Sequence, residues 1–188
     1  MDRIETIREY LSPYIVSRIH KKIEEAGRMR GDCLISFAAA AIHDALQREE
    51  QQPQWKPSYR GLFHLMTSLI TGSHEYELII ADKRMHLDES QVVSYWRPEF
   101  LYQDKQEEEY IRKELGKHFV RLSSYEITYA KRFVFYEYRN IMGVYWKEHL
   151  AGIMKLEGFV EMRKDTPFRF LFGDYMGETH AVLDYGEV

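Results

Sequence analysis

The chain has one cysteine in 188 residues and no long apolar run. Cys33 cannot form a disulfide within the chain, which argues against a secreted disulfide scaffold and favours a reducing compartment. No stretch approaches the roughly 18 apolar residues of a membrane-spanning helix, and the chain is charged from Asp2 onward where a signal peptide would be apolar. We therefore expect a cytoplasmic protein that makes no contact with a membrane.

Several short motifs with a known chemistry are also missing. The sequence has no glycine loop of the GxGxxG or GxxxxGK[ST] type, no GxSxG turn and no HExxH helix, and none of its eight histidines are paired at a spacing of four. These absences exclude the usual forms of dinucleotide-binding, P-loop, α/β-hydrolase and zinc-protease sites. We expect no cofactor and no catalytic activity, although catalytic residues drawn from distant positions would leave no local motif.

The charge is modest in total and uneven along the chain. The formal net charge is −4, but residues 110–170 hold 12 Lys and Arg against 7 Asp and Glu, a net +5, which leaves −9 for the remainder. An excess of this size is small for a dedicated nucleic-acid-binding protein. It marks the segment to which a polyanion would bind if one does.

The composition is that of an ordered globular protein, with 45% hydrophobic and 30% charged residues. A length of 188 residues suits one domain. The segment 47–57, with four glutamines and two prolines, has no periodicity and is the one place where an internal boundary could fall. We predict a single domain over residues 1–188, because 46 residues before this segment would form a marginal core alone.

Helical periodicity dominates the N-terminal third. Ser12 and Pro13 resemble a helix start, and apolar residues then recur at spacings of four and three as far as Gly27. Asp32 is the expected cap of a second helix with an alanine-rich face. The sequence predicts that these two helices form an antiparallel hairpin, followed by a third helix from Ser58 to Gly72.

The middle of the chain changes its period. Residues 76–81 form a β-rich apolar run, and residues 87–102 are typical of a short strand with a loop. Asp104 is the expected cap of a helix whose first turns carry an acidic run. Ser123 or Ser124 is the expected cap of a further helix, and the pattern does not decide whether this helix passes through Gly143 or ends there.

The last third is predicted to be β-structure. Three short runs at residues 159–162, 168–172 and 179–183 are separated by turn residues, which is typical of an antiparallel meander. The sequence therefore predicts an α+β fold with N-terminal helices and a small C-terminal antiparallel sheet.

One segment has an enzyme-like pattern. His43 and Asp44 lie late in the alanine-rich helix, and His20 lies on the helix before it. This arrangement resembles the metal-binding half of HD-type phosphohydrolases, over about thirty residues. The resemblance implies a divalent metal held by His20, His43 and Asp44, which would activate a water for attack on phosphorus.

The C-terminal segment resembles a winged-helix module over residues 104–173. A predicted helix at 145–156 is followed by a glycine, a strand, a charged turn and a second strand. This resemblance implies a nucleic-acid contact through cations on the helix and wing: Lys147, Lys155, Arg163, Lys164 and Arg169. Nucleic-acid binding is therefore one alternative function, and a metal-dependent phosphohydrolase is another.

Aromatic residues provide the third signal. They make up 14% of the chain and crowd the predicted helix after Ser123. One helix face can pack on the core, whereas Tyr125, Tyr129, Phe133 and Tyr136 point in other directions and need cover from this domain or from a partner. Our preferred hypothesis is a prokaryotic, non-catalytic regulatory protein that binds a protein partner, or a second copy of itself, through this helix and the C-terminal sheet.

Overall fold

The computed structural model describes residues 2–28 and 31–186. Its helices are α1 (Arg3–Arg28), α2 (Asp32–Gln51), α3 (Met66–Thr71), α4 (Asp104–Leu115), α5 (Ser124–Glu137), α6 (Arg139–Ile153) and α7 (Glu157–Glu161), with a 3-10 turn, η1, at Met85–Leu87. Its strands are β1 (Tyr59–His64), β2 (Tyr76–Ala81), β3 (Val92–Trp96), β4 (Phe168–Asp174) and β5 (Thr179–Tyr185). The predicted α+β class is confirmed.

The five strands form one mixed sheet in the order β3-β2-β1-β4-β5. β1 pairs antiparallel with β2 and parallel with β4, so the C-terminal β4–β5 hairpin joins a sheet that the middle of the chain began. In the parallel pair, the last residues, His64 and Asp174, lie opposite each other. The sheet thus brings together two segments about a hundred residues apart in sequence.

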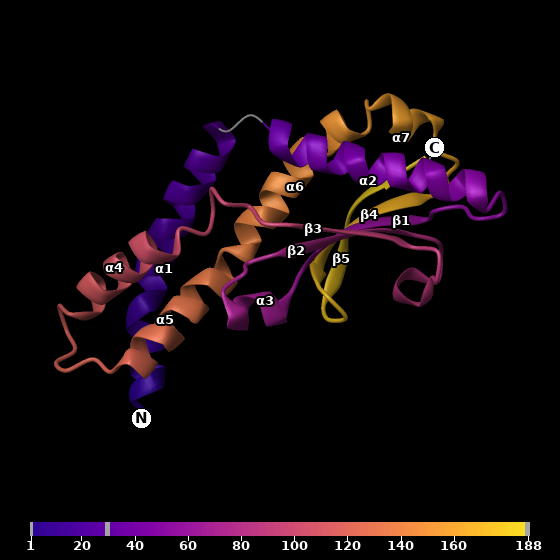
Figure 1. The fold of residues 1–188 in the computed structure, drawn as a ribbon. Coiled ribbons are helices and arrows are strands. Elements are labelled where there is room, and N and C mark those ends of the chain that lie inside the picture. Colours follow the sequence, from indigo (N-terminus) through magenta and orange to yellow (C-terminus); the bar gives the residue numbers. More distant parts are fainter. Residues whose placement is uncertain (1, 29–30, 187–188) are drawn as a thin grey trace.

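One face of the sheet is covered by α2, α6 and α7 (Figure 1). Successive side chains of a strand point to opposite faces of the sheet, and those of Leu62, Leu78 and Phe170 point from this face into the main hydrophobic core. Phe159 of α7 packs against Phe168 and Phe170 of β4. The burial of these side chains stabilises the two-layer arrangement of helix on sheet.

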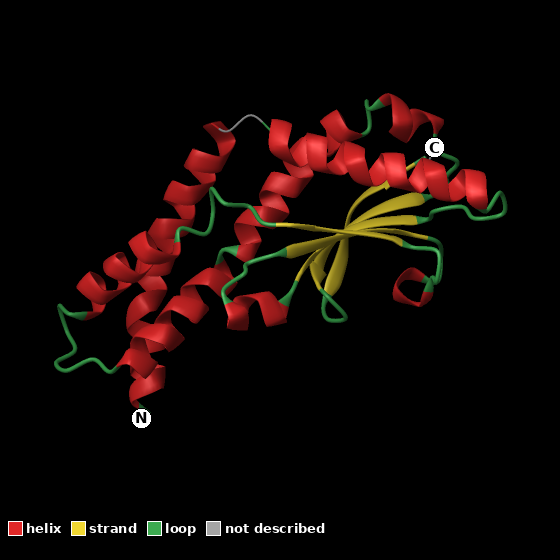
Figure 2. Cartoon of the chain, viewed as in Figure 1, coloured by secondary structure: helices red, strands yellow, loops and turns green. Residues whose placement is uncertain are grey.

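A second, helical part lies beside the sheet, where α1, α4 and α5 pack together and α6 extends from them towards the sheet (Figure 2). A buried ion pair between Glu107 of α4 and Arg18 of α1 joins two of these helices, with 2.8 Å between Nη2 and Oε2. The Tyr14 hydroxyl donates a hydrogen bond to the same carboxylate. Within residues 2–28 and 31–186, no helix has the length and apolar character needed to cross a membrane.

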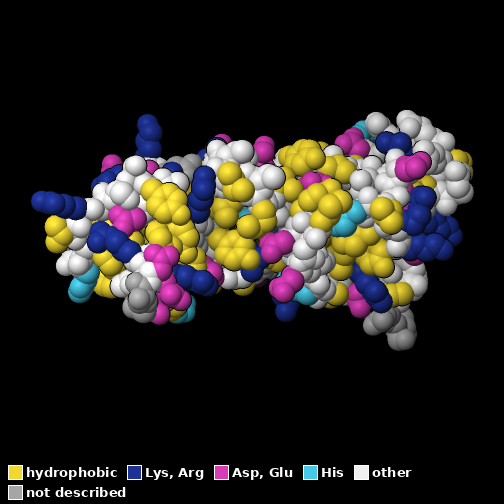
Figure 3. Space-filling model, turned by 90° about the horizontal axis from the view of Figure 1, so that it is seen from below, with side chains coloured by type: hydrophobic (Ala, Val, Ile, Leu, Met, Phe, Trp, Pro, Cys, Tyr) yellow, Lys and Arg dark blue, Asp and Glu magenta, His cyan; other side chains and the backbone are white. Residues whose placement is uncertain are grey.

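The other face of the sheet has no helix layer of comparable size. A smaller cluster of Phe63, Ile79, Ala81 and Leu171 lies there, and partly buried neighbours from η1 and the β4–β5 turn pack against it. Hydrophobic side chains are visible over this part of the molecule, bordered by charged ones (Figure 3). Among the described residues of this face, Tyr95 is an exposed aromatic side chain.

Three predictions for the N-terminal helices were wrong. α1 begins at Arg3 and continues through Pro13, since the burial of Ile7 and Leu11 against the other helices outweighs the backbone hydrogen bond that proline removes. α1 and α2 do not form the predicted hairpin, because α1 packs on α4, α5 and α6 while α2 packs on the sheet and α7. Asp32 begins α2 without a side-chain capping bond.

The segment predicted as the third helix forms a strand followed by a short helix. Tyr59–His64 forms β1, and only the six residues of α3 are helical, ending at Gly72 in the left-handed conformation. β1 lies in the middle of the sheet and five of its six residues are buried, so it lacks the alternation of apolar and polar residues by which a half-exposed strand is recognised. The strand predicted at residues 76–81 is confirmed as β2, and the short strand in residues 87–102 as β3.

The strands predicted at residues 168–172 and 179–183 are confirmed as the antiparallel hairpin β4–β5, but the third strand of the predicted meander and the winged-helix pattern do not form. Residues 157–161 make up helix α7, where the prediction placed a strand, since Phe159 and Met162 are buried three positions apart on one helical face. β4 then pairs with β1 on one side and β5 on the other, so it is an interior strand of a larger sheet. The segment 104–173 therefore has no pair of wing strands.

The aromatic segment forms two helices. A capping box of Ser123 and Glu126 begins α5, which confirms the predicted start. α5 ends at Glu137, and α6 begins at Arg139 and continues through Gly143. A Cβ atom at residue 143 would lie 3.0 Å from the Phe172 ring, so glycine allows α6 to approach β4 closely. Asp104 begins α4, and its side chain lies outside the described part of the structure.

Candidate functional site

A groove between α6 and β5 is the first feature of the candidate site. It has a volume of about 310 Å³, and its floor is the Phe172 ring of β4. The helix contributes Asn140, Gly143, Val144 and Lys147, and the strand contributes His180, Ala181 and Val182. The close approach of α6 to β4 at Gly143 leaves this groove along the outer side of the helix.

A second hollow of about 140 Å³ lies at the carboxyl end of β4. It is lined by Arg139, Asn140, Phe172, Gly173, Asp174, Glu178 and His180. Because Asn140, Phe172 and His180 line both hollows, we treat them as one continuous feature, the α6–β5 groove. Its mouth carries charges of both signs, and its middle is apolar.

A polar cluster lies at one end of this groove, where the partly exposed Arg139 and Asp174 line the hollow and His64 is buried. Arg139 forms an ion pair with Asp174, and the guanidinium carbon lies 4.0 Å from the centroid of the Tyr136 ring. His64 lies opposite Asp174 in the parallel pair, with 3.6 Å between Nδ1 and Oδ1, which is too long for a hydrogen bond. The Asp174 carboxylate thus binds the Arg139 guanidinium closely and lies near the His64 imidazole without a hydrogen bond to it.

His64 is unsuited to acid–base catalysis where it lies. Its side chain is only 1% exposed, so no substrate atom in the groove can reach the ring. Burial lowers the pKa of His64 to about 4, and the opposing effect of the Asp174 charge is smaller. The imidazole is therefore neutral near physiological pH and acts as part of the core.

β5, whose outer edge is free, borders the groove through His180, Ala181 and Val182. Every residue of β5 except Val182 is exposed, and within the described residues the strand pairs only with β4. A register shift between Phe170 and Leu171 leaves Val182 as an extra residue on β5 and directs it towards the core. An edge strand of this kind presents unpaired backbone N–H and C=O groups to a partner.

The domain itself covers most of the predicted aromatic interface. Phe133 and Tyr136 pack against the core and are flanked by the guanidinium groups of Arg8 and Arg139. Tyr129 is partly buried, and only Tyr125 is well exposed, at 68%. The four rings thus do not form one open surface on α5.

The five predicted nucleic-acid contacts are spread over different elements. Arg163 is bonded to Glu49 and to the carbonyl oxygen of Pro53, and Lys164 donates to the carbonyl oxygens of Phe159 and Met162. Arg169 of β4 forms an ion pair with Asp184. Two lysines remain exposed, Lys147 in the groove and Lys155 beyond the end of α6. Three of the five cations therefore already have intramolecular partners.

The predicted metal ligands are not brought together. His20 lies on α1, whereas His43 and Asp44 lie on α2, and the His43 Nε2 atom is 3.0 Å from the amide nitrogen of Gln47. No three His, Cys, Asp or Glu side chains within the described ranges 2–28 and 31–186 form a group that could hold a metal ion. The structure thus provides no support for the metal-dependent hypothesis.

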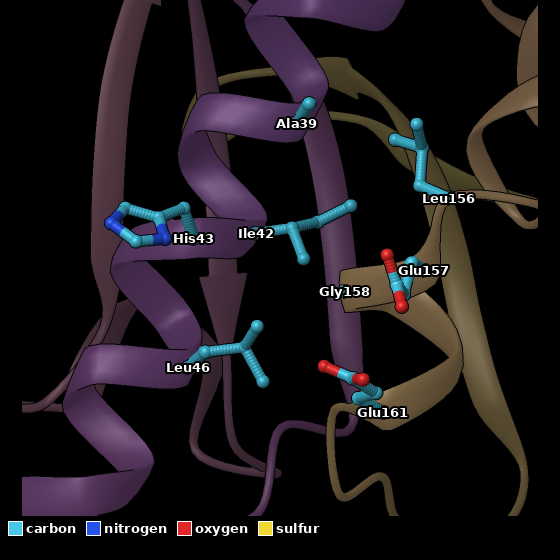
Figure 4. A pocket seen from close by; sticks show the side chains of 8 residues that line it. All are labelled: Ala39, Ile42, His43, Leu46, Leu156, Glu157, Gly158 and Glu161. Carbon is cyan, nitrogen blue, oxygen red and sulfur yellow. The ribbon is translucent and has the colours of Figure 1, made fainter.

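A shallow pocket of about 300 Å³ between α2 and α7 contains one of these histidines. Glu157 and Glu161 of α7 face Ile42 and Leu46 across it, while the His43 ring points away from both carboxylates (Figure 4). An apolar floor with two exposed carboxylates and no facing cation offers little to a small ligand. We therefore assign no function to this pocket.

Sequence reasoning missed Arg139, His64 and Asp174. His64 lay in a segment predicted to be helical, and Asp174 in a segment predicted to be a turn, so no local pattern joined them. No protein-family model, curated protein or solved structure matches the chain. The class that fold and groove define is a two-layer α+β protein with an open sheet edge beside a helix.

Proposed function

We propose that this protein is a non-catalytic binding module that takes an extended peptide segment of a partner protein as a sixth strand on β5. The observation that carries the proposal is the free edge of β5 beside the α6–β5 groove. In strand addition, backbone hydrogen bonds along the edge provide affinity, and pockets for alternate side chains provide specificity. A groove between an edge strand and a helix offers both in one place.

The lining of the groove indicates the chemistry of the peptide. Val144, Ala181 and the Phe172 ring form an apolar middle that accepts an aliphatic side chain. Lys147 is exposed at one border and makes no ion pair with any described residue, so it favours an acidic side chain. The expected partner segment is extended, carries an aliphatic residue next to an acidic one, and lacks proline in its centre, since proline cannot donate to a strand ladder.

The proposal moves the interface from the face of α5 to the α6–β5 groove. It keeps the C-terminal sheet as the contact surface and a protein as the partner. Binding is favoured over catalysis because the His64 ring is only 1% exposed and does not line the groove, so a substrate there would meet the Asp174 carboxylate without an accessible imidazole.

Selection from a displayed library of linear peptides, followed by calorimetric titration, tests the proposal. Enriched peptides should share the aliphatic–acidic pattern. Lys147→Glu should weaken their binding about tenfold or more, through loss of the attraction and gain of a repulsion. Val144→Glu should weaken it at least as much, because it places a charge in the apolar middle of the groove.

Matched controls are available outside the groove. Lys155→Glu changes the same charge outside the groove, and Val160→Glu changes an exposed valine on α7. Both should bind the selected peptides as the parent does. Equal binding by Lys147→Glu and Val144→Glu would rule out this groove. Sedimentation could also show that the parent is a dimer and that Val144→Glu is a monomer. In that case the edge of β5 would bind a second copy of the chain.

A further inference from the structure

A different hollow, on the side of the molecule where α2 begins, is lined by aromatic side chains from three separate segments. It has a volume of about 530 Å³, within the range of pockets that hold small organic ligands. Trp96 lies at the end of β3, Phe100 in the loop that follows, and Tyr145 on α6. The rest of the lining is Cys33, Arg97, Glu99 and Gln103. We call this hollow the aromatic pocket.

The walls of the aromatic pocket are held in place by contacts with each other and with residues outside it. The Trp96 ring stacks on Phe37 with centroids 5.9 Å apart, and the Phe100 ring lies against Tyr145 at 5.1 Å. Lys22 donates a hydrogen bond to the carbonyl oxygen of Phe100. The ring faces are therefore largely preorganised, which lowers the entropic cost of ordering them around a ligand.

Tyr145 provides the polar group of the pocket. Its side chain is only 2% exposed and lines the hollow, and no described residue hydrogen-bonds to its hydroxyl. The hydroxyl oxygen is not among the buried side-chain atoms without a hydrogen-bond partner, so it is open to the hollow, where it can donate to a ligand. Burial raises the pKa of Tyr145, so the group is a neutral O–H donor near physiological pH.

We propose that the aromatic pocket binds a small planar aromatic molecule that carries one hydrogen-bond acceptor. The ring system of the ligand lies between Trp96 and Phe100, and its acceptor atom accepts a hydrogen bond from the Tyr145 hydroxyl. Stacking on aromatic faces favours a flat ligand over an aliphatic one of equal area. The site is separate from the α6–β5 groove and shares none of its lining residues.

The neutral dye prodan, a naphthalene with a ketone acceptor, is the probe. We expect its emission to shift to the blue and its titration to saturate at one dye per chain. Tyr145→Phe removes only the hydroxyl and should weaken binding about fivefold, the effect of one net hydrogen bond. Trp96→Ala should weaken it more, since it removes a whole wall. Tyr125→Phe, an exposed tyrosine on α5, is the matched control and should bind as the parent does.

The unaltered chain supplies a second measurement that does not depend on a variant. Cys33 is exposed and lines the pocket, so saturating prodan should slow its alkylation by iodoacetamide several-fold. Circular dichroism checks that each variant is folded. Dye binding that does not saturate, or a Cys33 alkylation rate that saturating dye leaves unchanged, would overturn the proposal. Equal affinity in the parent, Tyr145→Phe and Trp96→Ala would do so as well.

Discussion

Arg60 of β1 is a charge buried in the core without an anionic partner, and its replacement makes a sharp prediction. The side chain is 0% exposed, and its one hydrogen bond runs from Nη2 to the carbonyl oxygen of Ala38, at 3.0 Å. Neither Nε nor Nη1 has a hydrogen-bond partner among the described residues. The guanidinium carbon lies 5.8 Å from the centroid of the Trp146 ring. We predict that Arg60→Met stabilises the protein.

The magnitude follows from the cost of burying the charge. Burial lowers the pKa of Arg60 from the ordinary arginine value to about 9, which corresponds to a penalty of about 5 kcal/mol on the charged form. Methionine removes this penalty but gives up a hydrogen bond of about 1 kcal/mol and a cation–π contact of about 2 kcal/mol. The expected gain in the free energy of unfolding is about 2 kcal/mol near neutral pH.

The effect should also depend on pH with a definite sign. Below the folded pKa of about 9, Arg60 is protonated in both states, and the full penalty applies. As the pH rises from 9 towards 12.5, the folded state releases the proton first, so the penalty is relieved and the parent gains stability relative to Arg60→Met. The advantage of the variant should therefore shrink between about pH 8 and pH 10.

Urea unfolding followed by far-ultraviolet circular dichroism measures the difference, provided that the slope against urea is unchanged. Arg112→Met, an exposed arginine on α4, is the control and should change stability by less than about 0.5 kcal/mol. An Arg60→Met variant less stable than the parent by more than about 1 kcal/mol would refute the reasoning. It would mean that contacts of the guanidinium inside the core outweigh the cost of its burial.

Three further predictions concern other parts of the fold. Glu107→Leu should cost about 3–5 kcal/mol, because Arg18 loses its buried partner, and a loss below about 1 kcal/mol in urea would contradict this. Because of His64, the free energy of unfolding of the parent should fall by about 3 kcal/mol as the pH falls from 6.5 towards 4, since over this range only the unfolded state takes up the proton. His64→Leu should abolish that part of the dependence of stability on pH. An unchanged dependence in the variant would contradict the role given to His64. Ser123→Ala should lower stability by about 1 kcal/mol through loss of the α5 cap, and thermal melts that coincide with the parent would argue against the capping box.

Local signals in the sequence succeeded where the structure depends on near neighbours. The strand β2 and the start of α5 were predicted correctly, because an apolar β-rich run and a Ser-x-x-Glu cap act within a few residues. The class of the fold also followed from the change of period along the chain. The prediction failed at β1, because nearly all residues of this interior strand are buried and the sequence shows no alternation. It also failed at α7, because two buried residues three positions apart fit a strand or a helix.

The candidate site depended on contacts that no local pattern contains. Residues of the α6–β5 groove come from α6 and from the β4–β5 hairpin, and they meet because β5 pairs with β4 and α6 crosses β4 at Gly143. The aromatic pocket likewise joins residues of α2, β3, its following loop and α6. Neither arrangement can be read from the spacing of the residues concerned.

The sequence by itself determined the α+β class, the position of several elements and the absence of an apolar span among the described helices, because these follow from period, caps and composition. Only the tertiary structure decided which strands are neighbours, which charges are buried and which edge stays open. Strand order and helix packing are set by the sum of many weak contacts between distant residues. The open edge of β5 and the buried charge of Arg60 are both consequences of that sum.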